Sequence, residues 1–148
     1  MLKYIHIILE YMQFGNGNIN MWNKDLGRQG ETLALSIYEK KGYTLIKKNE
    51  VSRNSELDLI LEKEGSRVED REILFVEVKT VIAENREGVQ PEDNFGKQKQ
   101  RAFKRGIELF LMKQKIKYEN IRIDLACIYY HKDTEKWTYK LYENMILE

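Results

Sequence analysis

The chain is organised around the stretch Ile73-Leu74-Phe75-Val76-Glu77-Val78-Lys79-Thr80. β-branched and aromatic residues crowd this stretch, and the charged, turn-prone run Glu69-Asp70-Arg71-Glu72 precedes it, so the pattern predicts a buried β-strand. Because side chains alternate across a sheet, Glu77 and Lys79 are expected on the same face of that strand. Burying such a charged pair is unfavourable unless a partner, a metal ion or an open cleft receives it. The stretch therefore also indicates a functional site.

Length and composition indicate one domain with an ordinary core. The chain has 148 residues, of which 42% are hydrophobic. Its net charge of +1 does not by itself indicate a nucleic-acid binder, although 25 Lys and Arg residues leave room for local basic faces. The single cysteine, Cys127, excludes an internal disulfide and a cysteine-based zinc site, and it suits a cytoplasmic protein. No run approaches the roughly 20 apolar residues of a membrane span, so no membrane partner is expected.

Residues 1–22 are interpreted as an N-terminal extension of unclear status, and residues 23–148 as the functional domain. The segment from Met1 to Phe14 is rich in apolar residues, but Glu10 interrupts it and no small-residue cleavage site follows, so a signal peptide fits poorly. Two interpretations stay open: an amphipathic addition, or a translated extension upstream of a natural start at Met21.

The rest of the pattern predicts a mixed α/β fold. Helices are expected from Asp25, as the N-cap, to about Lys41 and from about Gly96 to Gln114. Strands are expected over residues 43–51, 56–61, 73–80, 121–130 and 137–142, with Ile123, Leu125, Cys127 and Tyr129 pointing inward from the fourth. Residues 83–94 are interpreted as a mobile loop beside the site. The order predicts a five-stranded mixed sheet, in which the second helix crosses from the third strand to a parallel fourth.

Asp58 supplies a second acidic group on a neighbouring strand. Residues Leu57, Leu59 and Leu61 are expected on one face and Asp58 on the other, where antiparallel pairing brings it beside Glu77. Two close carboxylates repel unless a cation lies between them, and such oxygen ligands suit Mg²⁺ or Mn²⁺. We predict that Asp58, Glu77 and the backbone carbonyl of Val78 bind the metal. Lys79 would orient the attacking water or neutralise phosphate charge, and no small-molecule cofactor is needed.

The two helices contribute further candidates. Glu31 lies at the edge of the apolar stripe of the first helix, from which it reaches toward whatever the helix packs on. The candidates for nucleic-acid binding on the second helix are Lys99, Arg101, Lys104 and Arg105. Arg122 and Asp124 are interpreted as an ion pair within the sheet.

Each candidate also has a plainer interpretation. A Glu-x-Lys triplet is common in a chain with 33% charged residues, and a surface ion pair explains it. A glutamate on a helix flank is usually solvated, and so is a basic helix face. The apolar strand around Glu77, together with an upstream acid at Asp58, favours a site over a surface pair.

Several short motifs occur in the order typical of a known protein family. They are Leu26-Gly27-Arg28-Gln29-Gly30-Glu31, Lys41-Gly42-Tyr43, Glu56-Leu57-Asp58-Leu59-Ile60, Phe75-Val76-Glu77-Val78-Lys79-Thr80, Lys99-Gln100, Arg122-Ile123-Asp124 and Glu143-Asn144. Together they resemble the PD-(D/E)XK nuclease core of type II restriction enzymes and archaeal Holliday-junction resolvases, and more closely the small bacterial YraN-like family. The resemblance spans about Asn23 to Met145. It implies a restriction-endonuclease-like fold with Glu31, Asp58, Glu77 and Lys79 as the catalytic set.

The resemblance also implies a function. It implies a metal-dependent endonuclease that hydrolyses DNA, with branched or repair DNA as the structure-selective substrates. Two positions depart from the family pattern: Ser55 replaces a usual glycine, and Val81 replaces a usual arginine that contacts phosphate. The alternative that stays open is a nucleic-acid-binding or protein-interaction module with little or no turnover. A homodimer is the simplest arrangement for cutting two strands symmetrically.

Overall fold

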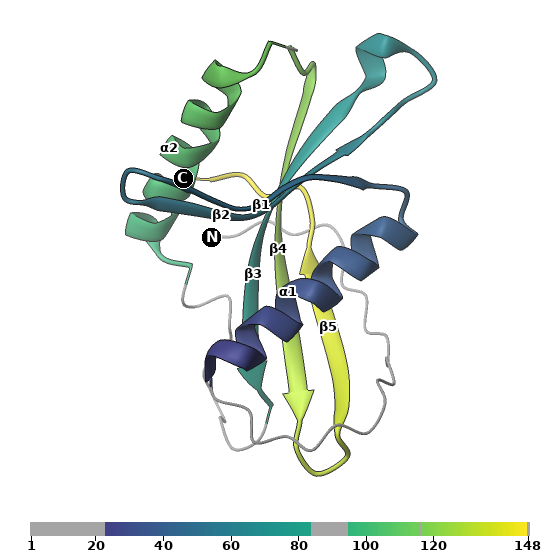
Figure 1. Ribbon diagram of the computed structural model, residues 1–148, viewed down its shortest axis with the longest axis vertical. Coiled ribbons are helices and arrows are strands. Elements are labelled where there is room, and N and C mark those ends of the chain that lie inside the picture. The colour runs from purple at the N-terminus through teal and green to yellow at the C-terminus, as the bar shows by residue number, and fades with distance from the viewer. Residues whose placement is uncertain (1–22, 84–94, 116, 148) are drawn as a thin grey trace.

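A computed structural model describes residues 23–83, 95–115 and 117–147. Five strands form one sheet in the order β1-β2-β3-β4-β5, and the two helices pack on opposite faces of it (Figure 1). The elements are α1 (Asn23–Lys40), β1 (Thr44–Ser52), β2 (Ser55–Lys63), the 3-10 turn η1 (Val68–Asp70), β3 (Glu72–Ile82), α2 (Lys97–Lys113), β4 (Asn120–His131) and β5 (Lys136–Tyr142). This order confirms the predicted mixed α/β fold.

The ends of both helices differ slightly from the sequence-based expectation. Helix α1 begins at Asn23, so Asp25 lies in its first turn and is not the N-cap. In α2 the expected end residues are the caps themselves, with Gly96 before the helix and Gln114 after it. The predicted extension over residues 1–22 and the predicted loop at residues 84–94 lie outside the described residues.

Strand β3 is the centre of the sheet. It pairs antiparallel with β2 and parallel with β4, the latter along its whole length from Glu72 to Ile82. Helix α2 connects these two parallel strands, as predicted, because parallel neighbours need a crossover connection. Across the described ranges, no helix is both long and apolar enough to cross a membrane.

The sheet separates two hydrophobic cores. Leu33, Ile37 and Tyr38 of α1 pack on one face, and Phe103, Ile107 and Phe110 of α2 pack on the other. The predicted inward face of β4, which includes Leu125 and Cys127, contacts the α2 side. The alternate β4 residues Ala126, Ile128 and Tyr130 are also buried, on the α1 side. A helix on each face buries both sets, which is typical of central strands in α/β sheets.

Gly30 lies at a tight contact between α1 and β3. A Cβ atom at Gly30 would lie 1.8 Å from Thr80 Oγ1 and 2.8 Å from Thr80 Cβ, so the helix backbone contacts the strand without room for a side chain. The next helix residue, Glu31, is thereby held close to the strand that carries Glu77.

We expect Gly30→Ala to lower the free energy of unfolding by about 2 kcal/mol or more, because the added methyl group overpacks the helix–strand contact. Alanine is otherwise favoured in a helix by about 1 kcal/mol over glycine. Gly27→Ala is the matched control, since nothing lies within 4 Å of its added Cβ atom, and it should be more stable than the native protein. Urea unfolding of both variants measures the difference. A Gly30→Ala variant as stable as Gly27→Ala would contradict the close approach.

Candidate functional site

Strands β2 and β3 separate at Asp58. Their last paired residues are Leu59 and Val76, so Asp58 and Glu77 lie next in register but beyond the ladder. In place of a ladder hydrogen bond, the Val78 N–H donates to Asp58 Oδ2 at 2.8 Å. A residue's N–H and C=O leave a β-strand on the same side, so the Val78 carbonyl also points into the gap between the strands. The gap is where the candidate site lies.

The β1–β2 hairpin forms one wall of this gap. The two strands stay paired up to Ser52 and Ser55, and the hairpin leans toward α2 (Figure 1). Leu57 belongs to the α2-side core, whereas Leu59 and Leu61 belong to the α1-side core. The prediction that these three leucines share one face is therefore wrong. The simple alternation of β2 is therefore interrupted at Asp58. Before Asp58 the strand end packs on α2, so Leu57 enters the α2-side core, and after Asp58 the leucines enter the α1-side core.

Asp58, Glu77 and Lys79 come together in a cleft of about 370 Å³. The Lys79 Nζ lies 3.0 Å from Glu77 Oε1, and only 19% of the Lys79 side chain and 11% of the Glu77 side chain are exposed. Strand alternation therefore places the two charges as predicted. The cleft is lined by Gly27, Glu31, Asn54, Ser55, Glu56, Asp58, Glu77, Val78, Lys79, Thr80, Phe95, Lys99, Ala102 and Phe103.

The surroundings of Asp58 favour its protonated form. Burial raises the pKa of Asp58 to about 8, and the negative charges of Glu77 and Glu31 act in the same direction. The hydrogen bond from Val78 N–H and the charge of Lys79 oppose this effect without cancelling it. Near neutral pH, burial and the neighbouring negative charges therefore resist ionisation of Asp58. A cation bound beside it would favour the ionised form.

Glu31 reaches the cleft from α1, as the sequence pattern predicted. Its Oε2 accepts a hydrogen bond from the Asn49 side-chain amide at 3.3 Å, and it contributes to the charge around Asp58. Asn49 falls opposite Asp58 in the β1–β2 register and has a φ of 52°. This left-handed backbone conformation is uncommon in a strand, although asparagine adopts it more readily than most residues.

The predicted basic cluster on α2 does not act as one group. All four side chains are exposed, but only Lys99 lines the cleft, where it lies beside Lys79; Arg101, Lys104 and Arg105 do not line it. Burial lowers the pKa of Lys79, but the neighbouring Lys99 amine and the Glu77 carboxylate outweigh burial and raise it above its usual value. The pKa of Lys99 is lowered by the neighbouring Lys79 and by burial. Of the two amines, Lys79 therefore keeps its proton more firmly.

The oxygen donors in the cleft fit a hard divalent cation. Among the described residues, no three His, Cys, Asp or Glu side chains form a metal-ligand group. An ion at this place would take Asp58, Glu77 and the Val78 carbonyl from the protein and complete its coordination with water or phosphate oxygens. Mg²⁺ usually binds in this way, through one or two carboxylates and several waters.

Part of the cleft wall consists of residues that were not among the predicted site residues. Asn54 and Ser55 at the hairpin tip and Phe95 before α2 line the cleft, as do Ala102 and Phe103. Asn54 and Ser55 fall between the first two predicted strands, and no periodicity ties them to the site. Ala102 and Phe103 lie three and four residues after Lys99, so helical periodicity does place them on the same side of α2.

Comparison with known proteins identifies the family. The chain matches the uncharacterised protein family UPF0102 over residues 30–128, a range that includes Glu31, Asp58, Glu77, Lys79 and Lys99. The chain belongs to this family. UPF0102 is the YraN family that the ordered motifs indicated.

Individual UPF0102 relatives match most of the chain. A UPF0102 protein of Rhodopirellula baltica is 31% identical over 128 residues, which cover 86% of this chain and 72% of that protein. A UPF0102 protein of Clostridium perfringens is 32% identical over 116 residues, which cover 78% of this chain and 88% of that protein. A UPF0102 protein of Caldicellulosiruptor saccharolyticus is 32% identical over 124 residues, covering 84% and 98% respectively.

Proposed function

We propose that this UPF0102 protein is a metal-dependent nuclease that hydrolyses phosphodiester bonds in DNA. One observation carries the proposal: Asp58, Glu77 and Lys79 meet in a cleft where β2 and β3 separate. A structural ion pair accounts for Glu77 and Lys79, but it does not account for a second acid whose ionised form is unfavourable in the apo protein. Two carboxylates and a lysine around a space open to solvent are suited to phosphate chemistry.

The residues of the cleft have distinct roles in this proposal. Asp58, Glu77 and the Val78 carbonyl would hold Mg²⁺ or Mn²⁺. Such an ion would supply a water of lowered pKa and positive charge to offset that of the phosphate. Glu31 contributes from the α1 side, where it orients water at the edge of the cleft.

The two lysines serve the phosphate. Lys79, whose pKa is raised, is protonated near neutral pH and donates to the attacking water or to a phosphate oxygen. Lys99 approaches the same point from α2 and stabilises the phosphate in the cleft. Arg101, Lys104 and Arg105 lie outside the cleft, so their contribution is limited to attracting the DNA backbone.

The test is a DNA cleavage assay in Mg²⁺, in Mn²⁺ and in chelator. The substrates are supercoiled, linear, single-stranded and four-way-junction DNA. We expect metal-dependent cleavage that Glu77→Gln and Lys79→Met each reduce by at least about 100-fold, because the first removes the charge of a metal ligand and the second removes the cation that faces the water or phosphate. Lys97→Met is the matched control: it lies on the first turn of α2, is exposed and does not line the cleft, so its rate should stay near native.

Two outcomes would contradict the proposal. Equal cleavage by the native protein and the Glu77→Gln variant would indicate a contaminating nuclease. No cleavage of any substrate, with DNA binding retained, would favour a nucleic-acid-binding module on the same fold. Thermal unfolding of each variant, run beside the assay, separates loss of the site from loss of the fold.

A further inference from the structure

The acidic groups of the site are recessed. The cleft volume of about 370 Å³ holds on the order of a dozen water molecules. It is at the small end of the range for clefts that bind one small molecule. Glu77 lines this cleft, and 11% of its side chain is exposed. A phosphate must therefore enter the cleft to meet both carboxylates.

Three different elements surround the entering group. Asn54 and Ser55 of the hairpin tip form one wall, Gly27 and Glu31 of α1 form another, and the start of α2 forms the third. The floor is β3. A nucleotide inside this space has protein on three sides. If the nucleotide belonged to a duplex, the complementary strand would have to fit into the same space.

The hairpin wall is fixed against α2. A Cβ atom at Gly106 would lie 2.3 Å from Ser55 Oγ and 3.1 Å from Leu57 Cδ2, so the hairpin and the helix are in tight contact. The hairpin strands stay paired up to Ser52 and Ser55. The hairpin therefore cannot move away from α2 to widen the cleft without breaking this packing.

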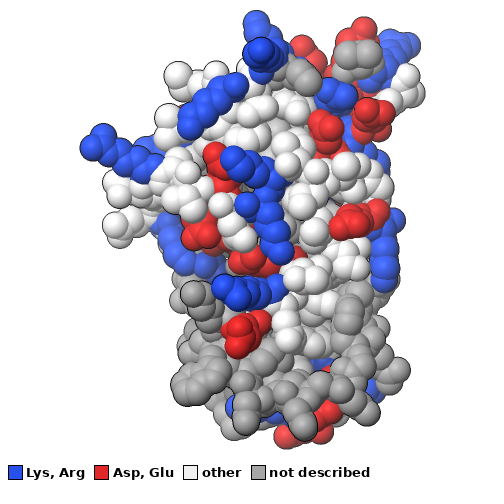
Figure 2. All heavy atoms as spheres, viewed as in Figure 1, with Lys and Arg blue, Asp and Glu red and all other residues white. Residues whose placement is uncertain are grey.

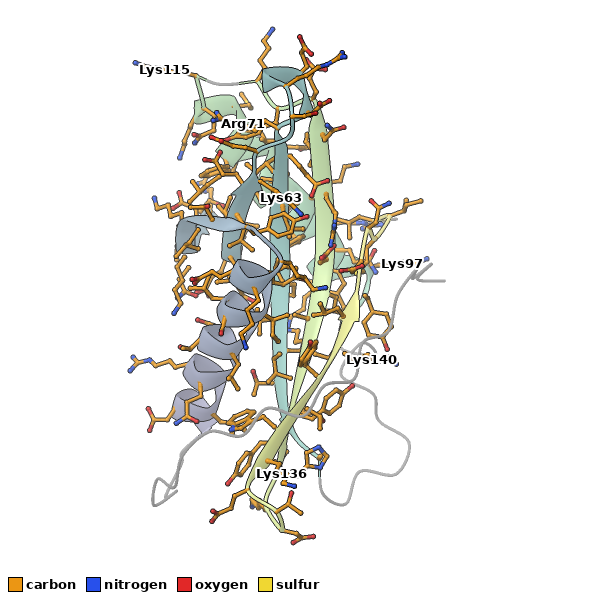
Figure 3. The ribbon with its side chains drawn as sticks, turned by 90° about the vertical axis from the view of Figure 1, so that its right-hand side faces the viewer. Lys63, Arg71, Lys97, Lys115, Lys136 and Lys140 are labelled. Carbon is orange, nitrogen blue, oxygen red and sulfur yellow. The ribbon has the colours of Figure 1, made fainter. Side chains whose placement is uncertain are left out.

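The distribution of surface charge also agrees with a short contact between the protein and DNA. Basic and acidic side chains are interspersed on the face shown in Figure 2, without one continuous basic surface. None of the six basic residues labelled in Figure 3 lines the cleft, and Lys115, Lys63 and Lys136 lie near one end, the middle and the other end of the molecule. Duplex binders usually present a basic stripe that follows the phosphate backbone.

We propose that the cleft accepts one unpaired DNA strand, so that the substrate class is single-stranded DNA or the unpaired arms and gaps of branched DNA. This inference rests on the proposed nuclease function. A strand inside a duplex must first be unpaired and unstacked, which costs a few kcal/mol per base, whereas an unpaired strand enters without that cost. An intact duplex is then a poorer substrate than an unpaired strand of the same sequence.

The experiment compares one labelled sequence in three forms with Mg²⁺ or Mn²⁺. The forms are a single strand, a blunt duplex, and a duplex that carries the same sequence as an unpaired flap. We expect the single strand and the flap to be cleaved at least 10-fold faster than the duplex. Equal or faster cleavage of the blunt duplex would overturn this inference and leave the nuclease function standing. No cleavage of any form would overturn both.

A variant of the wall tests the entry route itself. Ala102 is half-buried and lines the cleft, so Ala102→Leu extends into the space that the strand would occupy. It should lower the cleavage rate on single strands by at least 10-fold with an unchanged melting temperature. Glu108→Leu, an exposed position on the same helix outside the cleft, should leave that rate near native. A full rate for Ala102→Leu would show that the strand does not pass along α2.

Discussion

Asp124→Ala is expected to destabilise the protein by about 3–5 kcal/mol, the usual effect of removing one partner of a buried ion pair. The Asp124 side chain is fully buried, with 0% exposure. Its carboxylate accepts hydrogen bonds from Arg122 Nε at 2.9 Å, Arg122 Nη2 at 2.8 Å and the Tyr38 hydroxyl at 2.8 Å. A fourth comes from Asn144 N–H at 2.9 Å. Its removal leaves a guanidinium, a hydroxyl and a backbone amide without their main acceptor.

The position of Asp124 explains why the loss should be large. It joins α1 through Tyr38, strand β4 through Arg122, and the segment after β5 through Asn144. Arg122 extends the network to Glu143, with Nη2 to Oε1 at 3.1 Å. The same C-terminal segment is held by a hydrogen bond from Met145 N–H to the Ile123 carbonyl at 2.7 Å. Asp124 therefore stabilises contacts among three parts of the chain.

Urea unfolding of a double-mutant cycle measures this effect. Arg122→Ala should also be destabilising, because it leaves the Asp124 charge buried and unpaired, but the double variant should lose clearly less than the sum of the two single losses. Tyr38→Phe is the graded control and should cost about 1 kcal/mol, since it removes one hydrogen bond and keeps the ring in the core. Additive losses in the cycle would contradict a coupled pair.

The parts of the fold that depend on local pattern were predictable from the sequence. The β-branched and aromatic run at residues 73–80 identified β3, alternating apolar residues identified β2 and β4, and the second predicted helix, about Gly96 to Gln114, corresponds to α2. Alternation along β3 placed Glu77 and Lys79 together, and the antiparallel register brought Asp58 next to them. The Arg122–Asp124 ion pair within the sheet is likewise confirmed.

The parts that depend on distant contacts were not predictable. Alternation alone keeps Leu57 on the face of Leu59, but the contact of the hairpin with Gly106, far along the chain, moves Leu57 to the other core. The opening between β2 and β3 follows from that contact. The cleft is thus a product of tertiary packing, whereas its charged residues follow from the strand pattern.

The basic cluster on α2 is an intermediate case. At about 100° per residue, Lys99 and Arg101 lie about 200° apart around a helix, so periodicity already separates them. The sequence does not say which side of α2 faces the site. That choice is made by Phe103 and Ile107, which are buried against the sheet and turn Lys99 toward the cleft.

Asp58→Asn is expected to stabilise the metal-free protein at pH 8. The pKa of Asp58 is about 8 in the folded state and 3.8 for the unperturbed group, so the folded state binds this proton more tightly than the unfolded state. Stability should therefore fall as pH rises from about 4 to about 8. The shift is about 4 pKa units, so at about 1.4 kcal/mol per unit the loss in the native protein is on the order of 6 kcal/mol. The variant lacks this titration, and its side-chain oxygen can still accept the hydrogen bond from Val78.

The measurement is urea unfolding of the native protein and Asp58→Asn between pH 4.5 and pH 8.5 in chelator, with the exposed Glu69→Gln as the control that follows the native profile. The two stabilities should be similar at low pH and diverge toward pH 8; parallel profiles would contradict the raised pKa. Millimolar Mg²⁺ or Mn²⁺ should then stabilise the native protein, by about 2.7 kcal/mol at 100 times the dissociation constant, and leave Asp58→Asn nearly unchanged. A purely structural role for Asp58 does not predict that stabilisation by metal depends on this carboxylate. A gain with metal that depends on Asp58 would mean that the property that raises its pKa, burial beside the negative charge of Glu77, is also the property that makes the cleft a cation site.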